Sequence, residues 1–117
     1  MNKYHSVLTE VDNIKFDSKK EERRYQELKL LERAGEIMSL DVHPTYLLQE
    51  SFMYQGKKIQ PITYAPDFRY VENGATVCED VKGIDRRTGK PITLTEATGI
   101  KIKMFKKLNP HIDFRIV

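Results

Sequence analysis

The stretch YAPDFRYVENGATVCEDVK, residues 64–82, decides the expected fold. It contains two runs in which apolar and polar residues alternate, joined by Asn73-Gly74. Asn-Gly between two alternating runs is a strong signal for a β-hairpin with a two-residue turn. We therefore predict two antiparallel strands, one on each side of this turn, at the centre of a sheet.

Charged residues lie on both predicted strands. Asp80 and Lys82 are two residues apart, so their side chains are expected on the same face of the second strand. Asp67 on the first strand can reach that face, which would bring two carboxylates and an ammonium group together. This combination predicts a metal site with a cation beside it. The alternative is a solvated face, the usual location of Asp and Lys on a strand, with Pro66-Asp67 as a common turn dipeptide.

The apolar residues around these charges favour the metal site. Phe68, Tyr70 and Val77 make both strands look like buried core strands. Buried strands rarely carry a charge that has neither a partner nor an ion.

Length and composition are typical of a single soluble domain. The 117 residues suffice for one hydrophobic core, and 39% are hydrophobic and 32% charged. No apolar run approaches the roughly 20 residues of a membrane span, and residues 1–6 have no apolar signal-peptide core. The single cysteine, Cys78, excludes an internal disulfide, and no Cys/His spacing indicates zinc. We expect a cytoplasmic protein.

Positive charge is concentrated in the last third of the chain. The net charge is 20 − 17 = +3, but residues 81–108 hold eight basic and two acidic residues, a balance of +6, which leaves −3 for the rest. A basic segment beside an acidic cluster could hold a polyanion over a metal, whereas the alternative is a solvated lysine-rich helix and an exposed charged turn. The predicted nucleic-acid contacts are Arg86, Arg87, Lys90, Lys101 and Lys103.

The first helix is predicted from Ser18 to Ala34. Ser18 and Glu21 fit a capping box, and Gly35 is the expected stop. Glu21 also continues the apolar stripe one turn back from Tyr25, so its side chain is expected to face the sheet. Its structural role as a cap and a role as a metal ligand both remain open.

The other elements follow from periodicity. Residues 1–15 read as a polar N-terminal arm and residues 16–117 as a single domain, with strands between Ile37 and Val71. His43 has no second histidine at ligand spacing and is interpreted as structural or surface. A second helix, capped by Thr93 or Thr95, should run to about Leu108, before a last strand in residues 112–117. Its buried stripe is predicted to be Leu94, Ala97, Met104 and Leu108, with Lys101 on the same stripe.

The order helix, three strands, helix, strand, together with Pro66-Asp67 and Asp80-Val81-Lys82, resembles the PD-(D/E)xK nuclease superfamily. Residues 16–21, 65–70 and 79–83 also resemble a family of small phage-encoded proteins of unknown function (DUF1064), which is similar to archaeal-type Holliday-junction resolvases. The resemblance extends from about residue 16 to residue 117. It implies an α/β, restriction-endonuclease-like fold: an αβββαβ core whose mixed central sheet is flanked by helices.

The resemblance also implies roles for individual residues. The metal ligands would be Asp67, Asp80, the carbonyl of Val81, and Glu21 directly or through water. Lys82 would orient or activate the attacking water and neutralise charge on the phosphate. Glu79 departs from the motif because it lies one residue out of register, on the opposite face from Asp80. If the register were shifted, Glu79 would replace Asp80 and Lys82 would lose its role.

The function implied by the resemblance is a metal-dependent endonuclease. Mg²⁺ prefers oxygen ligands, with Mn²⁺ as a substitute, and without an ion one of the two aspartates is expected to hold its proton. The implied substrate is branched DNA such as Holliday junctions in phage recombination or replication within a bacterial host cell. Because resolution needs paired nicks, a homodimer is expected. The alternatives are a nicking or flap-type nuclease without junction preference, a non-catalytic nucleic-acid-binding phage protein, and a phage assembly module.

Overall fold

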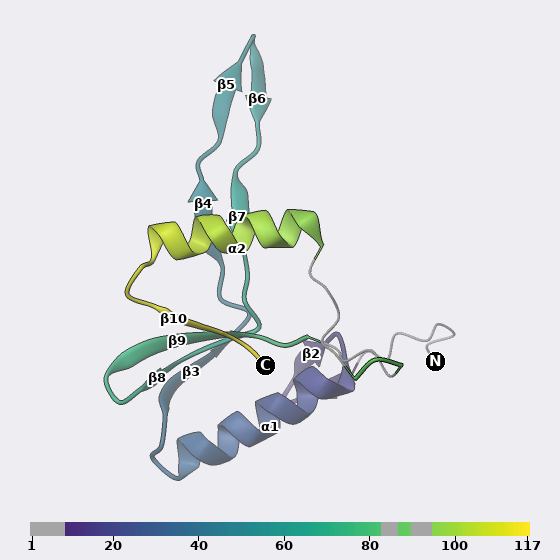
Figure 1. Ribbon diagram of the computed structural model, residues 1–117, viewed down its shortest axis with the longest axis vertical. Helices are drawn as coiled ribbons and strands as arrows, with labels where there is room; N and C mark the ends of the chain where they lie inside the picture. Colours follow the sequence, from purple (N-terminus) through teal and green to yellow (C-terminus); the bar gives the residue numbers. More distant parts are fainter. Residues whose placement is uncertain (1–8, 83–86, 90–94) are drawn as a thin grey trace.

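The computed structural model describes residues 9–82, 87–89 and 95–117 and has an α/β fold (Figure 1). The helices among these residues are α1 (Lys19–Arg33) and α2 (Glu96–Leu108). The strands are β1 (Thr9–Val11), β2 (Ile14–Phe16), β3 (Met38–Val42), β4 (Tyr46–Gln49), β5 (Phe52–Tyr54), β6 (Lys57–Ile59), β7 (Ile62–Tyr64), β8 (Phe68–Glu72), β9 (Ala75–Asp80) and β10 (Asp113–Ile116).

The main sheet is mixed and has the strand order β10-β9-β8-β3. β3, β8 and β9 pair antiparallel, and β10 pairs parallel to β9. Along the chain, the two helices and the strands of this sheet follow the order α1, β3, β8, β9, α2, β10, as predicted. Between β3 and β8 the chain leaves the sheet and forms two further antiparallel ribbons, β4 with β7 and β5 with β6.

The predicted hairpin at the centre of the sheet is confirmed. Glu72 pairs with Ala75 across a two-residue turn, and both Asn73 and Gly74 have positive φ, 50° and 78°. Mirror-image turns of this kind match the twist of antiparallel strands and require positive φ at both positions. The turn thereby fixes which residues of β8 and β9 share a face.

The first helix covers one face of the main sheet. Ser18 is its N-cap, with Oγ accepting a hydrogen bond from the Glu21 N–H at 3.1 Å, and the chain turns away at Gly35, whose φ is 78°. The buried residues of α1 are Glu21, Tyr25 and Leu28, and Leu31 is partly buried against the same core, so Glu21 faces the sheet as predicted. The core on this side contains Phe16, Tyr25, Leu28, Ile37, Phe68, Tyr70 and Val77. Val11 and Ile14, in the described part of the predicted arm, pack against it.

The second helix covers the opposite face and packs against the β4–β7 ribbon (Figure 1). Thr95 is its N-cap, as one of the two predicted caps. The core on this side contains Leu48, Tyr64, Cys78, Ile102 and Phe105. The second core therefore depends on strands that lie outside the main sheet.

The predicted buried stripe of α2 is wrong at Ala97 and Leu108, which are exposed, whereas Met104 is partly buried and packs against this core. Leu94 lies outside the described residues. The buried residues of this helix are Ile102 and Phe105, which the predicted stripe did not include. Apolar residues occur on several sides of α2, so the sequence pattern does not decide which side is buried. The contacts of Phe105 with the rings of Tyr46 and Tyr64, on β4 and β7, show which side packs.

The β5–β6 hairpin projects away from the rest of the molecule (Figure 1). The radius of gyration is 16.4 Å, larger than the roughly 13 Å expected for a compact domain of this length. Among the described residues, no helix has the length and apolar character needed to cross a membrane.

Candidate functional site

The predicted acidic residues meet at one end of the main sheet. Asp67 immediately precedes β8 and Asp80 ends β9, and because these strands are antiparallel both residues lie at the same end. The Asp67 N–H donates to the Glu79 carbonyl at 2.9 Å. The first turn of α1 reaches the same place, where Lys20 Nζ donates to the Lys82 carbonyl. We call Glu21, Asp67 and Asp80 the acidic cluster.

Asp67 is held in a partly buried position. Its Oδ2 accepts a hydrogen bond from the Val81 N–H at 2.6 Å. Burial raises the pKa of the Asp67 carboxyl to about 8, against the lowering effect of the Val81 N–H, and the negative charges of Glu21 and Asp80 raise it further. The direction of this shift agrees with the prediction that one carboxyl holds its proton, and burial is a larger cause of it than charge repulsion.

Asp80 and Lys82 lie on the same face, as predicted. Asp80 is 6% exposed, and its Oδ1 lies 3.1 Å from Lys82 Nζ. Asp80 Oδ2 accepts a hydrogen bond from the Tyr64 hydroxyl at 2.5 Å. Burial and the bond to Asp80 raise the pKa of Tyr64, so this hydroxyl stays a donor. The Lys82 N–H donates to the Val117 carbonyl at 2.9 Å, which extends the pairing of β9 with β10 to the lysine.

Glu21 uses its backbone and its side chain for different contacts. Its N–H is capped by Ser18, while its carboxylate, 3% exposed as a residue, has Oε1 at 2.7 Å from His43 Nε2. The backbone N–H of His43 in turn donates to the Asp67 carbonyl at 3.0 Å. A cap and a ligand role for Glu21 are therefore compatible.

His43 is one of two residues at this site that the sequence reasoning missed. Ligand atoms of Glu21, His43 and Asp67 all lie within 4.8 Å of one another. The backbone of His43 has φ = 52°, a region uncommon for residues other than glycine and one often associated with functional sites. A histidine directly after a strand and before a proline was the available signal. Tyr64 was also missed; its signal was an aromatic at the end of a strand just before Pro66-Asp67.

These donors suit a divalent cation. Carboxylate oxygens are ligands of both Mg²⁺ and Mn²⁺, and an imidazole nitrogen is a common ligand of divalent transition metals. Glu21, His43 and Asp67 supply both kinds of atom in one group, with the carboxylate of Asp80 adjoining Asp67.

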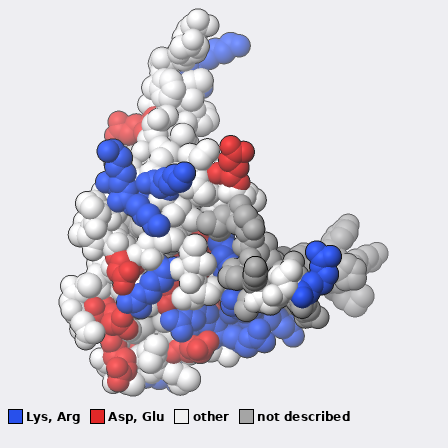
Figure 2. All heavy atoms as spheres, in the orientation of Figure 1, with Lys and Arg blue, Asp and Glu red and all other residues white. Residues whose placement is uncertain are grey.

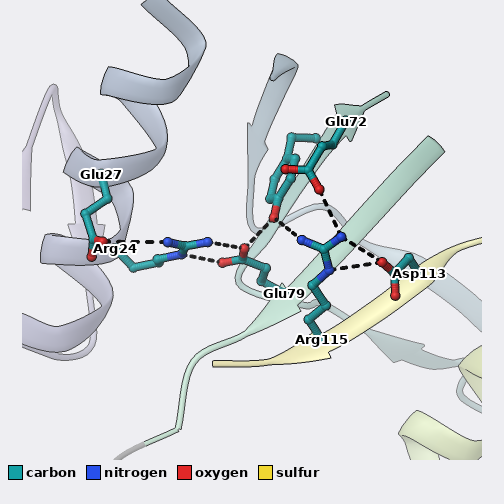
Figure 3. Close-up of polar contacts among 7 residues, drawn as sticks. Arg24, Glu27, Glu72, Glu79, Asp113 and Arg115 are labelled. Carbon is teal, nitrogen blue, oxygen red and sulfur yellow. Dashed lines mark hydrogen bonds and ion pairs between the residues drawn. The ribbon is translucent and has the colours of Figure 1, made fainter. Parts of the chain in front are cut away.

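Glu79 faces away from the acidic cluster, as predicted, and has a separate set of partners (Figure 3). It is fully buried, and its carboxylate accepts hydrogen bonds from Arg24 Nε at 2.8 Å and Arg24 Nη2 at 2.6 Å. The Tyr70 hydroxyl donates to the same carboxylate at 2.5 Å, and Arg115 lies beyond, bonded to Glu72 at 3.0 Å. The hydrogen bonds with Glu79 raise the pKa of Arg24. Glu79 therefore joins α1 to the sheet.

The predicted nucleic-acid contacts are spread over two segments. Arg86 and Lys90 lie outside the described residues. Arg87 is exposed, and on α2 Lys103 is exposed and Lys101 is partly buried. Their role in binding stays a prediction.

The comparisons with known proteins show the family of this chain. Neither the curated proteins nor the solved structures include a significant match to this chain. One family model, described as a protein of unknown function (DUF1064), matches residues 1–116. This match spans nearly the whole chain. The protein therefore belongs to the DUF1064 family.

Proposed function

We propose that this protein is a metal-dependent DNA endonuclease of the PD-(D/E)xK type, which hydrolyses phosphodiester bonds in branched DNA such as Holliday junctions during phage recombination or replication. The observation that carries the proposal is the convergence of Glu21, Asp67, Asp80 and Lys82 at one end of the sheet. The αβββαβ order of α1, the main-sheet strands and α2 also supports it. The restriction-endonuclease-like identity of the core and the choice of branched DNA are parts of this proposal.

The site residues fit a divalent ion. Glu21, His43 and Asp67 would hold it, with Asp80 and the Val81 carbonyl as the further ligands that the family resemblance implies. When bound, the ion would supply charge stabilisation at the phosphate and a water of lowered pKa. Mg²⁺ is the expected cofactor, and Mn²⁺, which takes the same oxygen ligands, is the expected substitute.

Side chains around the site orient the acidic cluster and would neutralise charge on a bound phosphate. Lys82 is held beside Asp80 at 3.1 Å, where its ammonium would neutralise charge that develops on a phosphate. Tyr64 fixes Asp80 from the other side by donating its hydroxyl hydrogen at 2.5 Å. His43 Nε2 contacts Glu21 Oε1 at 2.7 Å, a contact that a bound ion would replace. The acidic side chains are therefore oriented before an ion or substrate binds, which reduces the entropy lost when the site is assembled.

Cutting a branched substrate in two strands requires two sites, so we propose a homodimer. The predicted basic residues Arg86, Arg87, Lys90, Lys101 and Lys103 would supply phosphate contacts. Sedimentation analysis of the full chain, alone and with a four-way junction, tests the dimer.

The decisive experiment compares cleavage of linear, nicked, flap and four-way DNA by the wild type and Asp80→Asn, with and without Mg²⁺ or Mn²⁺. We expect divalent-dependent cleavage, greatest on the four-way junction, and loss of at least about 100-fold in Asp80→Asn. Glu36→Gln makes the same chemical change at an exposed position and should cleave as the wild type does. Cleavage that survives unchanged in Asp80→Asn would sink the proposal, and equal cleavage of all branched forms would favour a nicking or flap-type enzyme.

A second candidate is a non-catalytic nucleic-acid-binding protein. One observation favours it: both oxygens of Asp80 already have protein partners, Tyr64 and Lys82, so this carboxylate can serve as a structural group. This candidate predicts DNA binding without cleavage in any divalent ion. Isothermal titration of Mn²⁺ would then show no site that depends on Glu21.

A further inference from the structure

We propose that the β5–β6 hairpin is a nucleic-acid-binding arm whose aromatic face stacks on unpaired bases next to the cleavage site. The inference deepens the proposed function and rests on it for the location of cleavage, but not for binding. The β5–β6 hairpin would be the element that distinguishes branched or single-stranded DNA from blunt duplex DNA.

The first observation is the exposure of the hairpin. Every residue of β5 and β6 is exposed. Phe52 is 44% exposed, Met53 65% and Tyr54 60%, although Phe and Met are among the residue types most often buried. Three large apolar side chains in consecutive positions on a projecting ribbon indicate a contact surface.

The second observation is the division of side chains between the two faces. Phe52 pairs with Ile59 and Tyr54 pairs with Lys57, so these four side chains share one face. Met53 pairs with Lys58 on the other face. One face thus presents two aromatic rings with a lysine beside them, which we call the aromatic face.

The third observation is the charge of the hairpin, which selects the kind of partner. Residues 51–64 contain two lysines and no acidic residue. Figure 2 shows Lys and Arg atoms near the end of the hairpin, and no acidic atoms there on the face drawn. Two copies of this hairpin would repel each other, whereas a polyanion would be attracted.

The chemistry of the aromatic face selects the form of nucleic acid. Aromatic side chains stack on the faces of bases, which are open only where bases are unpaired, while lysines contact phosphates of any form. Reading of a duplex groove depends on polar side chains at base edges, and Phe52, Tyr54 and Ile59 supply little of this. The aromatic face therefore suits the unpaired bases of a branch point or an overhang.

The position of the hairpin connects it to the acidic cluster. The β4–β7 ribbon forms its base, and Tyr64 at the end of β7 holds Asp80. Gly56 at the tip lies eight residues before Tyr64, and eight residues of extended strand span at most about 26 Å at roughly 3.3 Å per residue. A strand bound along the ribbon would thus reach from the hairpin to the site within about eight nucleotides at roughly 3.4 Å per nucleotide.

The test measures binding in EDTA, so that cleavage plays no part. Fluorescence anisotropy is recorded with a labelled duplex carrying a single-stranded overhang and with the matched blunt duplex. Phe52→Ala/Tyr54→Ala should weaken binding of the overhang DNA by about tenfold or more and leave blunt duplex binding nearly unchanged. Met53→Ala, the matched apolar change on the other face, should bind both DNAs as the wild type does. Lys57→Ala/Lys58→Ala should weaken both DNAs and reduce the salt dependence.

Three results would overturn the inference. The first is unchanged overhang binding by Phe52→Ala/Tyr54→Ala, and the second is an equal loss on both DNAs, which would indicate a duplex-groove contact. The third is conversion of a dimer to a monomer by the same variant in sedimentation, which would assign the face to a second copy. Unchanged circular dichroism would show that the fold is intact. If the wild type binds overhang DNA but never cleaves with Mg²⁺, the proposed function fails and the hairpin inference stands.

Discussion

Replacing Arg24 with alanine should destabilise the protein strongly without touching the acidic cluster. Glu79 is fully buried and receives two hydrogen bonds from Arg24, at 2.8 and 2.6 Å. In Arg24→Ala this carboxylate keeps the hydrogen bond from the Tyr70 hydroxyl but loses the one cationic side chain that pairs with it among the described residues. A buried charge that loses its partner costs about 3–5 kcal/mol.

The lower end of that range applies here. The Arg24 side chain is 24% exposed, so water reaches the space that the truncation opens and partly solvates Glu79. We expect a loss of about 3 kcal/mol in the free energy of unfolding, or a fall of about 10 °C in Tm for a chain of this size. Urea and thermal unfolding, followed by circular dichroism, measure both quantities.

The controls separate this ion pair from a general effect of losing an arginine. Arg23→Ala, at the exposed neighbouring position, should change stability by no more than about 0.5 kcal/mol. Adding Glu79→Gln to Arg24→Ala should recover part of the loss, because the buried charge is then removed. If Arg24→Ala is within about 1 kcal/mol of Arg23→Ala, the reasoning about Glu79 is refuted.

Three further changes test other features. In metal-free buffer, the Asp67 carboxyl has a pKa of about 8 in the folded state against an ordinary value of 3.8, so the folded state binds the proton more tightly than the unfolded state. The stability that this group contributes should therefore be highest below about pH 4 and fall as the pH rises through about 8. Asp67→Asn should remove this pH dependence from the free energy of unfolding, measured by urea titrations at a series of pH values. Tyr64→Phe leaves Asp80 Oδ2 without its hydroxyl donor, so Tm should drop by the equivalent of about 1–2 kcal/mol, whereas no drop would show that the bond is unimportant. Gly74→Ala forces an L side chain to φ = 78° and should cost about 1–2 kcal/mol in chemical unfolding, and equal stability would argue against the mirror-image turn.

Local signals in the sequence predicted the elements that depend on local geometry. Asn73-Gly74 predicted the central hairpin, Ser18 and Gly35 the limits of α1, and Thr95 was one of two predicted caps of α2. Each of these residues acts on hydrogen bonds or dihedral angles within a few positions of itself. The same locality explains why Asp80 and Lys82 were correctly placed on one face.

Features that depend on distant partners were not predictable in this way. The sequence indicated strands between Ile37 and Val71, but not that β4 to β7 leave the main sheet as separate ribbons. Ile102 and Phe105 are buried because the β4–β7 ribbon packs against α2. The sequence of the helix alone does not indicate which side this ribbon covers. His43 was missed for a similar reason, since its ring nitrogen meets Glu21 from a position 22 residues away.

Glu79 and Asp80 are adjacent on β9, so their side chains lie on opposite faces of the strand. The contacts of both side chains therefore depend on the number of residues in β9. Adding or deleting one residue between Gly74 and Glu79 would exchange the two side chains between faces, since side chains alternate along a strand. A deletion would bring the shorter Asp80 to Arg24, and an insertion would bring the longer Glu79 to Tyr64, so neither change would keep both sets of contacts. A single change in the length of β9 would thus disrupt both the buried ion pair and the acidic cluster. We therefore expect insertions and deletions within the family in arms such as β5–β6, whose residues are all exposed.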